Sequence, residues 1–270
     1  MNLNIENKTA VITGGDSGIG LETAKILTSE GVKVILTDIN EEDLKEAKSK
    51  IKNHNSDAVV YSKACDLTNF KAVDAFAEMV KKEYGGADIL VNCAGARGAA
   101  GDFLELTDED WQKTIDIDLM GAVRICRAFI PQMREKKWGR IILIASENAF
   151  QPYVDESPYN ACKAGVINLS KCLSRSYGKE GILVNTVSPA FIETPMTDAM
   201  MEQLAEERDT SMEEAVEYFL ENDRPHLTAG RRGKPEEVAA VISFLCSEQA
   251  SYVNGSNYRV DSGAVESAFG

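Results

Sequence analysis

The fold is decided by one glycine-rich stretch, Thr13-Gly14-Gly15-Asp16-Ser17-Gly18-Ile19-Gly20. An apolar run at 9–13 before it predicts a buried strand, and residues 21–30 after it predict a helix. In such a unit, glycines permit a tight turn, a close backbone approach to a pyrophosphate and close packing of the helix. The helix start also offers unpaired N–H groups to phosphate oxygens. We therefore expect residues 14–20 to bind the phosphates of a dinucleotide.

The carboxylate of Asp38 bears on which dinucleotide fits. Asp38 ends a second predicted strand and stands 18 residues past Gly20. A carboxylate there can accept hydrogen bonds from ribose hydroxyls and would repel a 2′-phosphate. No Arg or Lys occurs within 13–20 or 37–44, and Asp16 adds negative charge. Asp38 could instead only cap a turn; we favour NAD(H) over NADP(H).

Strand and helix signals alternate along the rest of the chain. Strands separated by helices pair in parallel through right-handed crossovers. We therefore expect a single α/β domain over residues 1–270, with a doubly wound, Rossmann-like parallel sheet of about seven strands and helices on both faces. Ligands bind such a sheet outside the carboxyl ends of its strands. The expected strands are 9–13, 32–38, 58–64, 89–91, 141–144, 183–187 and 258–260, and the expected helices are 21–30, 41–53, 69–84, 107–133, 157–177 and one that begins at 235.

Residues 195–225 differ from the rest in their charge. They hold ten acidic residues against Arg208 and Arg224. One interpretation is a solvated amphipathic surface helix. The other is a helical lid insertion over the substrate, because long insertions beside a site often move. The apolar face of this segment is marked by Met212, Val216, Phe219 and Leu220.

Composition excludes several classes of function. The net charge of −14 disfavours nucleic acid and anionic membranes as partners, because both need basic surface. No apolar run approaches the ~20 residues that span a bilayer, and the first residues do not resemble a secretory signal. The six cysteines are not clustered, so we expect reduced packing residues and no metal site. We expect a cytoplasmic protein.

Tyr159 and Lys163 stand four residues apart, a spacing that places both side chains on one face of a helix. An unperturbed tyrosine titrates near pH ~10, and a nearby ammonium lowers that pKa, which suits a general acid/base. Such a pair alone is also common on solvated helix faces. Ser146, however, closes a strand 13 residues before Tyr159, and its hydroxyl can reach the same pocket.

The ordered set of motifs resembles the classical short-chain dehydrogenase/reductase family, nearly from end to end. The resemblance implies that Tyr159 exchanges a proton with the substrate oxygen while hydride passes to or from a nicotinamide. It implies that Ser146 orients that oxygen, and that Lys163 binds the nicotinamide ribose and lowers the pKa of Tyr159. The matching positions are Thr13–Gly20, Asp38, Asp66-Leu67, Asn92-Cys93-Ala94-Gly95, Ser146, Tyr159, Lys163, Asn185, Ser188-Pro189, Thr194, Gly233–Val238 and Asp261-Ser262-Gly263.

The resemblance also implies a cofactor channel and an assembly. Asp66 and Leu67 would contact the adenine, and Thr194 would hold the carboxamide with Ile192 nearby. Family members are typically tetramers, so a homo-oligomer, tetramer or dimer, is expected. The implied cofactor-binding residues are Gly14, Asp16, Ser17, Gly18, Ile19, Gly20, Asp38, Asp66, Leu67, Asn92, Ala94, Gly95, Tyr159, Lys163, Pro189, Ile192 and Thr194.

One catalytic position departs from the family pattern. Seven residues after Trp111 the family commonly carries Asn, which holds a water that links the lysine to solvent; this chain has Asp118. An ionised Asp cannot donate hydrogen bonds, and its charge would offset the effect of Lys163 on Tyr159. We therefore expect Asp118 to raise the optimum pH relative to Asp118→Asn, unless the replacement is silent.

Three functions remain open at this point. We favour an NAD-dependent oxidoreductase acting on a small secondary alcohol or ketone, such as an alcohol, sugar or hydroxy acid. A 3-oxoacyl-thioester reductase is the alternative within the family, although residues 195–225 would repel anionic carriers if they border the pocket. A non-enzymatic NAD(H)-binding regulator is the third, and only Asp118 favours it. Arg97 could pair with a carboxylate substrate or be a solvated loop residue.

Overall fold

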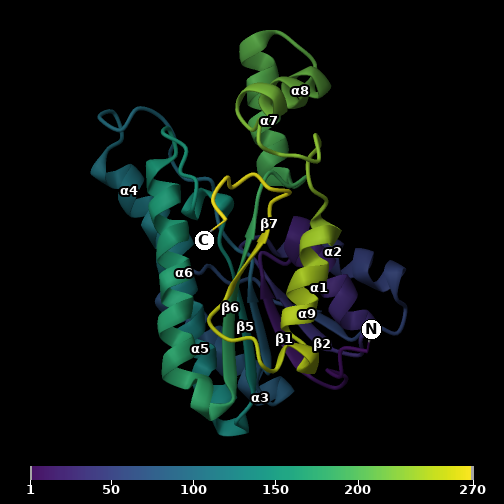
Figure 1. The fold of residues 1–270 in the computed structure, drawn as a ribbon. Coiled ribbons are helices and arrows are strands. Elements are labelled where there is room, and N and C mark those ends of the chain that lie inside the picture. Colours follow the sequence, from purple (N-terminus) through teal and green to yellow (C-terminus); the bar gives the residue numbers. More distant parts are fainter. Residues whose placement is uncertain (1, 269–270) are drawn as a thin grey trace.

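A seven-stranded sheet forms the centre of the computed structural model, which describes residues 2–268 (Figure 1). Every neighbouring pair of strands is parallel, and the order is β3-β2-β1-β4-β5-β6-β7. The chain therefore reverses its direction of winding between β1 and β4, which confirms the doubly wound sheet. The strands are β1 (Thr9–Thr13), β2 (Lys33–Thr37), β3 (Val60–Ser62), β4 (Ile89–Asn92), β5 (Gly139–Ile144), β6 (Ile182–Pro189) and β7 (Asn257–Val260).

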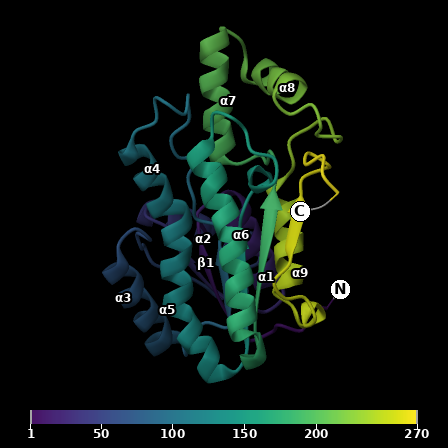
Figure 2. The same cartoon turned by 60° about the vertical axis from the view of Figure 1, so that its left-hand side comes forward.

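Helices cover both faces of the sheet (Figure 2). Ala10 and Ile12 of β1 pack with α1, α2 and α9, whereas Val11 faces the apolar layer of α3, α5 and α6. Alternate strand residues thus enter opposite cores. No helix in residues 2–268 is long and apolar enough to cross a membrane. The helices are α1 (Gly18–Ser29), α2 (Glu41–His54), α3 (Phe70–Tyr84), α4 (Asp108–Thr114), α5 (Gly121–Lys136), α6 (Ser157–Tyr177), α7 (Pro195–Arg208), α8 (Met212–Asn222) and α9 (Pro235–Leu245).

The helix expected at 107–133 is divided in the structure. Thr107 and Asp110 form the expected capping box at the start of α4. A π-helical segment, Ile115–Met120, then separates α4 from α5. A π-helical turn holds more backbone than an α-helical one and re-aims the side chains within it. Asp118 lies in this segment and is buried.

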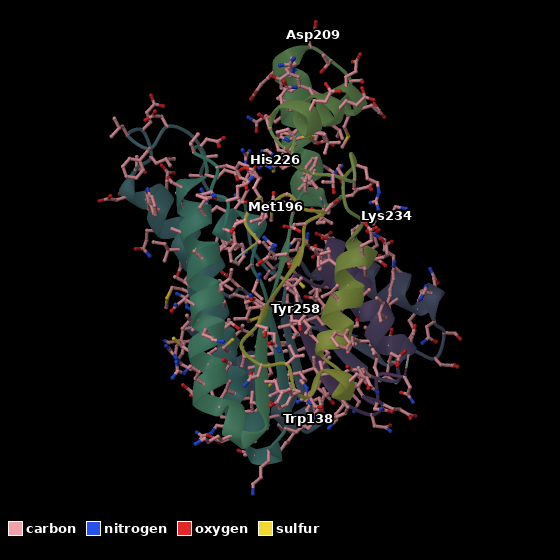
Figure 3. The ribbon with its side chains drawn as sticks, viewed as in Figure 1. Trp138, Met196, Asp209, His226, Lys234 and Tyr258 are labelled. Carbon is pink, nitrogen blue, oxygen red and sulfur yellow. The ribbon has the colours of Figure 1, made fainter. Side chains whose placement is uncertain are left out.

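The segment 195–225 forms a helical hairpin, α7 and α8, that projects beyond the carboxyl ends of the strands (Figure 3). Asp209 lies at its tip, at the opposite end of the molecule from Trp138. The apolar face expected on this segment packs inward, because Phe219 is buried in a small separate core with Phe191 and Met201. The hairpin therefore has its own packing and stands over the edge where a ligand would bind.

Candidate active site

The glycine-rich turn joins β1 to α1 in a shape that only glycines fit. Gly14 and Gly18 have positive φ angles of 61° and 48°. A Cβ on Gly14 would lie 2.7 Å from the backbone nitrogen of Ala94, and one on Gly20 would lie 2.0 Å from the Gly14 carbonyl oxygen. Ser17, which precedes α1, makes no side-chain capping hydrogen bond. The first-turn N–H groups of α1 thus have no side-chain cap and suit phosphate oxygens.

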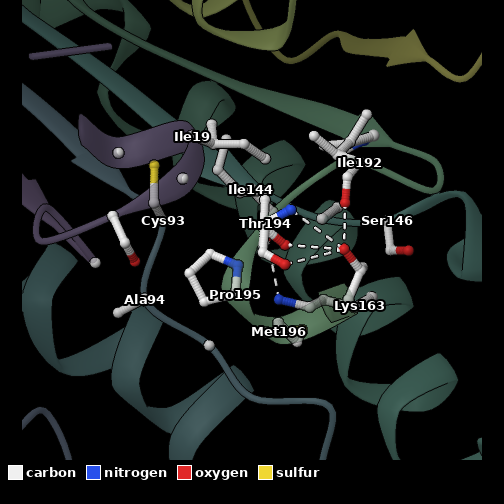
Figure 4. Close-up of a pocket in the computed structure, with 18 of the residues that line it drawn as sticks. Ile19, Cys93, Ala94, Ile144, Ser146, Lys163, Ile192, Thr194, Pro195 and Met196 are labelled. Carbon is white, nitrogen blue, oxygen red and sulfur yellow. Dashed lines mark hydrogen bonds between the residues drawn. The ribbon is translucent and has the colours of Figure 1, made fainter. Parts of the chain in front are cut away.

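A cleft of about 350 Å³ extends from this turn to Tyr159 and Lys163. Figure 4 shows residues that line it, among them Ser146 and Lys163. It lies outside the carboxyl ends of the strands, where ligands bind doubly wound sheets. Most residues predicted to form the site lie in its walls. Those predicted residues are Gly14, Asp16, Ser17, Gly18, Ile19, Gly20, Asp38, Ala94, Gly95, Ser146, Tyr159, Lys163, Pro189, Ile192 and Thr194.

Three predicted cofactor residues lie outside the cleft walls. Asn92 is buried and accepts a hydrogen bond from Thr13 Oγ1 at 2.9 Å, so it supports the glycine-rich turn from below. Leu67 is buried in the core beside α5. Asp66 is exposed and accepts hydrogen bonds from Thr68 in a local turn. A contact of Asp66 and Leu67 with adenine stays a prediction.

Tyr159 and Lys163 lie in the first turns of α6, with the Lys163 ammonium 5.2 Å from the centre of the Tyr159 ring. Ser146 lies just beyond β5, where its hydroxyl donates a hydrogen bond to Asn148 Oδ1 at 2.9 Å, and it lines the same cleft as Tyr159. Burial raises the pKa of Tyr159; Lys163 and Ser146 lower it, and Asp118 raises it further. The net pKa is raised. Lys163 thus acts in the expected direction, but burial outweighs it.

Asp118 makes a direct ion pair with Lys163. Its Oδ1 lies 3.2 Å from Lys163 Nζ and also accepts a hydrogen bond from the Ala96 backbone N–H at 3.2 Å. Burial lowers the pKa of Lys163, but the charges of Asp118 and Tyr159 and the hydrogen bond to Asp118 raise it, with a net increase. Lys163 therefore stays an ammonium group despite being buried.

A second, smaller cavity borders Ser146 and Tyr159, and its two acidic residues, Glu147 and Glu156, were not predicted from the sequence. Glu147 Oε1 lies 3.4 Å from Arg224 Nε, and Glu156 Oε1 accepts a hydrogen bond from Arg97 Nε at 3.2 Å. Both carboxylates are buried. Arg97 is therefore engaged with Glu156 and is not a freely solvated loop residue. The one available signal was the presence of Glu147 and Glu156 between Ser146 and Tyr159, and the sequence did not reveal that these two acids are buried.

Comparison with known proteins places these features in a family. A family model described as enoyl-(acyl carrier protein) reductase matches residues 14–265. An uncharacterized oxidoreductase of Bacillus subtilis, YxbG, is 36% identical over 97% of this chain and 92% of its own length. The chain belongs to the short-chain dehydrogenase/reductase family.

Other members of the short-chain dehydrogenase/reductase family are similar to this chain along nearly its whole length. The 3-oxoacyl-[acyl-carrier-protein] reductase FabG of Thermotoga maritima is 33% identical over 97% of this chain and 100% of its own. L-sorbose reductase from Gluconobacter frateurii, solved with NADPH and L-sorbose, superposes with a TM-score of 0.93 at 36% identity, covering 99% and 100% of the two chains. The protein is therefore an oxidoreductase of this family, whose fold binds a nicotinamide cofactor and whose members act on small molecules.

Proposed function

We propose that the protein transfers hydride between NAD(H) and a small secondary alcohol or ketone. The observation that carries this proposal is the meeting of Tyr159, Ser146 and Lys163 at one end of the cleft that begins at the glycine-rich turn. A proton-transferring group and a cofactor cradle in one cleft match the needs of alcohol–ketone interconversion.

The chain supplies positioning and proton transfer. When bound, the nicotinamide supplies or accepts the hydride. In alcohol oxidation, Tyr159 takes the proton of the substrate hydroxyl, and in ketone reduction it returns that proton. Ser146 donates a hydrogen bond to the reacting oxygen and stabilises its developing charge. The Lys163 ammonium favours the phenolate of Tyr159, because an opposite charge nearby stabilises the ionised form.

Three groups of residues would hold the cofactor. The N–H groups at the start of α1 would bind the pyrophosphate, and Asp38 would accept hydrogen bonds from the adenosine ribose. Lys163 would bind the nicotinamide ribose, and Thr194 the carboxamide. A 2′-phosphate would bring negative charge beside Asp38, which already lies near Asp16. Among residues 2–268, Lys163 is the only Lys or Arg in the cleft walls, which supports NAD(H) even though L-sorbose reductase was solved with NADPH.

The α7–α8 hairpin is proposed as a lid over this site. Met196 and Thr197, at the base of α7, line the cofactor cleft. Arg224, just after α8, reaches Glu147 in the small cavity. A movement of the hairpin would therefore change both cavities. We also propose that the protein works in the cytoplasm as a homo-oligomer, tetramer or dimer, as is typical of the family.

A 3-oxoacyl-thioester reductase is the second candidate, because relatives of that name match the whole chain. The acidic hairpin beside the pocket disfavours it, since carrier proteins and CoA are anionic. An NAD(H)-binding regulator would bind cofactor without turnover.

The test is coenzyme turnover by the purified protein. NADH formation from NAD⁺ is followed with secondary alcohols, and NADH consumption with ketones and with acetoacetyl-CoA, for wild type and Tyr159→Phe. Turnover of alcohols and ketones that Tyr159→Phe loses by about 10²-fold or more supports the proposal. Preference for acetoacetyl-CoA would favour the second candidate, and NADH binding without any turnover would favour the regulator.

A further inference from the structure

The small cavity beside Ser146 and Tyr159 combines reacting groups with buried charge. Its volume is about 70 Å³, which suits a substrate of a few carbon atoms. Arg97, Glu156 and Arg224 also line a larger open groove under the hairpin, so the cavity has a route to solvent. The cavity is lined by Arg97, Ser146, Glu147, Asn148, Glu156, Tyr159 and Arg224, with Phe191, Met196, Met200 and Phe219 as its apolar part.

One carboxylate oxygen of Glu147 has no hydrogen-bond partner in residues 2–268. Its side chain is 3% exposed. Oε1 accepts a hydrogen bond from the Tyr153 hydroxyl at 3.1 Å, and Oε2 is buried without a hydrogen-bond partner in residues 2–268. An unsatisfied buried acceptor is unfavourable, and more so when it is charged. A donor brought by the substrate would satisfy it.

The charges around this cavity balance. The Arg224 guanidinium lies 3.4 Å from Glu147 and stacks on Tyr153, 3.2 Å from the centre of its ring. Arg97 is bound to Glu156, whose other oxygen accepts a hydrogen bond from Asn148. Each arginine of the cavity thus faces a buried carboxylate. A carboxylate or phosphate on the substrate would meet two acids and no unmatched cation, so a neutral polar substrate fits best.

We propose that the substrate carries a second hydroxyl, on the carbon next to the reacting one, and that Glu147 Oε2 accepts its hydrogen bond. Glu147 and Ser146 line the same small cavity, so the carboxylate and the hydroxyl that would hold the reacting oxygen face one bound substrate. The substrate class is then vicinal diols and polyols, and in the reverse direction α-hydroxy ketones. The second hydroxyl stays unchanged: hydride leaves the neighbouring carbon for NAD⁺, and the proton leaves through Tyr159. This inference rests on the proposed function and names its substrate class.

A series of four-carbon probes tests the inference with the wild-type protein alone. The alcohols 2-butanol, 2,3-butanediol and erythritol are compared with NAD⁺, and 2-butanone, acetoin and erythrulose with NADH. We expect kcat/KM to rise at least about tenfold from 2-butanol to 2,3-butanediol and from 2-butanone to acetoin, because only the second of each pair satisfies Glu147. 3-Hydroxybutanoate and acetoacetyl-CoA represent the anionic classes.

The outcomes distinguish failure of the proposed substrate class from failure of the proposed hydride transfer. Equal or better use of the mono-oxygenated probes, or of an anionic probe, overturns the inference while hydride transfer itself stands. Absence of turnover with every probe overturns the proposed function and the inference together. Preference for the hydroxylated probes supports both.

Glu147→Gln then assigns the preference to one side chain. It keeps the shape of Glu147 but removes the anionic acceptor, so at about pH 8.5, where the Glu147 carboxyl with its raised pKa is ionised, the diol-to-monoalcohol ratio of kcat/KM should fall about fivefold or more, mainly through KM for the diol. Glu78→Gln, at an exposed position of α3, is the control with the same chemical change. NADH binding by each variant reports folding. A properly folded Glu147→Gln that keeps the wild-type ratio would overturn the role of Glu147.

Discussion

Asp118 and Lys163 form a buried ion pair, with 3.2 Å between Asp118 Oδ1 and Lys163 Nζ and with side-chain exposures of 0% and 6%. The negative charge raises the pKa of Lys163 and contributes to the raised pKa of Tyr159. The carboxylate thus holds the lysine in its charged form while it opposes ionisation of the tyrosine. Replacement of Asp118 by asparagine should remove both effects, because both come from the same charge.

Asp118→Asn should move the pH profile of alcohol oxidation to lower pH. Oxidation needs the phenolate of Tyr159, and removal of the Asp118 charge lowers the pKa at which that phenolate forms. The midpoint of kcat/KM against pH should fall by about half to one unit. The control is Asp74→Asn, an exposed carboxylate on α3. Superimposable profiles for wild type and Asp118→Asn would show that the carboxylate has no influence on the proton step.

The free energy of unfolding should depend on Asp118 and Lys163 jointly, because the two side chains form one buried ion pair. Lys163→Met leaves the Asp118 carboxylate buried without its ammonium, which should lower the free energy of unfolding by about 3–5 kcal/mol. Adding Asp118→Asn removes the orphaned charge and should restore part of that loss, but no activity. Urea denaturation of the two single variants and the double variant gives the coupling free energy. Strictly additive losses would argue against a direct interaction.

Asp38 should determine the choice between NAD⁺ and NADP⁺. Wild type should have a kcat/KM for NAD⁺ at least about tenfold higher than for NADP⁺, because the carboxylate repels a 2′-phosphate. Asp38→Asn with Ile39→Arg removes this repulsion and adds a cation at an exposed position, so the ratio should approach or pass one. The control is Asp57→Asn, which changes an exposed carboxylate in the loop between α2 and β3. A wild type that uses both coenzymes equally would refute this role.

Gly20→Ala should damage the cofactor site through its added methyl group. A Cβ there would lie 2.0 Å from the Gly14 carbonyl oxygen, so backbone must move. We expect a loss of about 2 kcal/mol or more in unfolding free energy, together with weaker NADH binding. In Gly121→Ala the new Cβ meets nothing closer than 3.5 Å, and this helical site should tolerate or slightly favour alanine. Equal behaviour of the two variants in thermal unfolding and NADH titration would contradict the model of the turn.

Glu147 should make stability fall as pH rises. Burial raises the pKa of Glu147 to about 7, against the opposing charge of Arg224 and the Tyr153 hydrogen bond. Its ordinary pKa is 4.5, so the unfolded chain loses this proton first. The contribution of Glu147 to the free energy of unfolding is therefore complete below the pKa of the unfolded chain. It is lost as pH rises through about 7, and the loss is on the order of 1–3 kcal/mol. Urea unfolding of Glu147→Gln should lack this decline; an identical decline would assign it to other groups.

The parts of the fold that sequence predicted are those set by local pattern. Residues 13–20 contain the end of a strand, a turn and the start of a helix. Their glycines therefore predicted both the α/β fold and the place where the cofactor phosphates would bind. The run at 9–13 has an apolar centre, Ala10-Val11-Ile12, without polar alternation, because both faces of β1 are buried. Tyr159 and Lys163 were predicted to share a helix face from spacing alone.

The parts that sequence did not predict depend on contacts between distant segments. Residues 107–133 read as one helix, since nothing local marks the π-helical turn that holds Asp118 against Lys163. Glu147 and Arg224 are far apart in the chain and meet only because the chain after α8 returns to the segment that follows β5. Acidic residues in general indicate surface, so the burial of Glu147 and Glu156 was missed.

Transfer of deuteride from labelled NADH is the most direct test of the proposal that the protein passes hydride to a ketone with Tyr159 as the proton donor. NADH labelled with deuterium on the transferring face of its nicotinamide is incubated with the protein and acetoin or 2-butanone, and the product alcohol is examined by mass spectrometry and NMR. We expect one deuterium on the new carbinol carbon with wild type, and a loss of about 10²-fold or more in the rate at which this labelled product forms with Tyr159→Phe. Unlabelled product, no product with either ketone, or equal rates for wild type and Tyr159→Phe would contradict it.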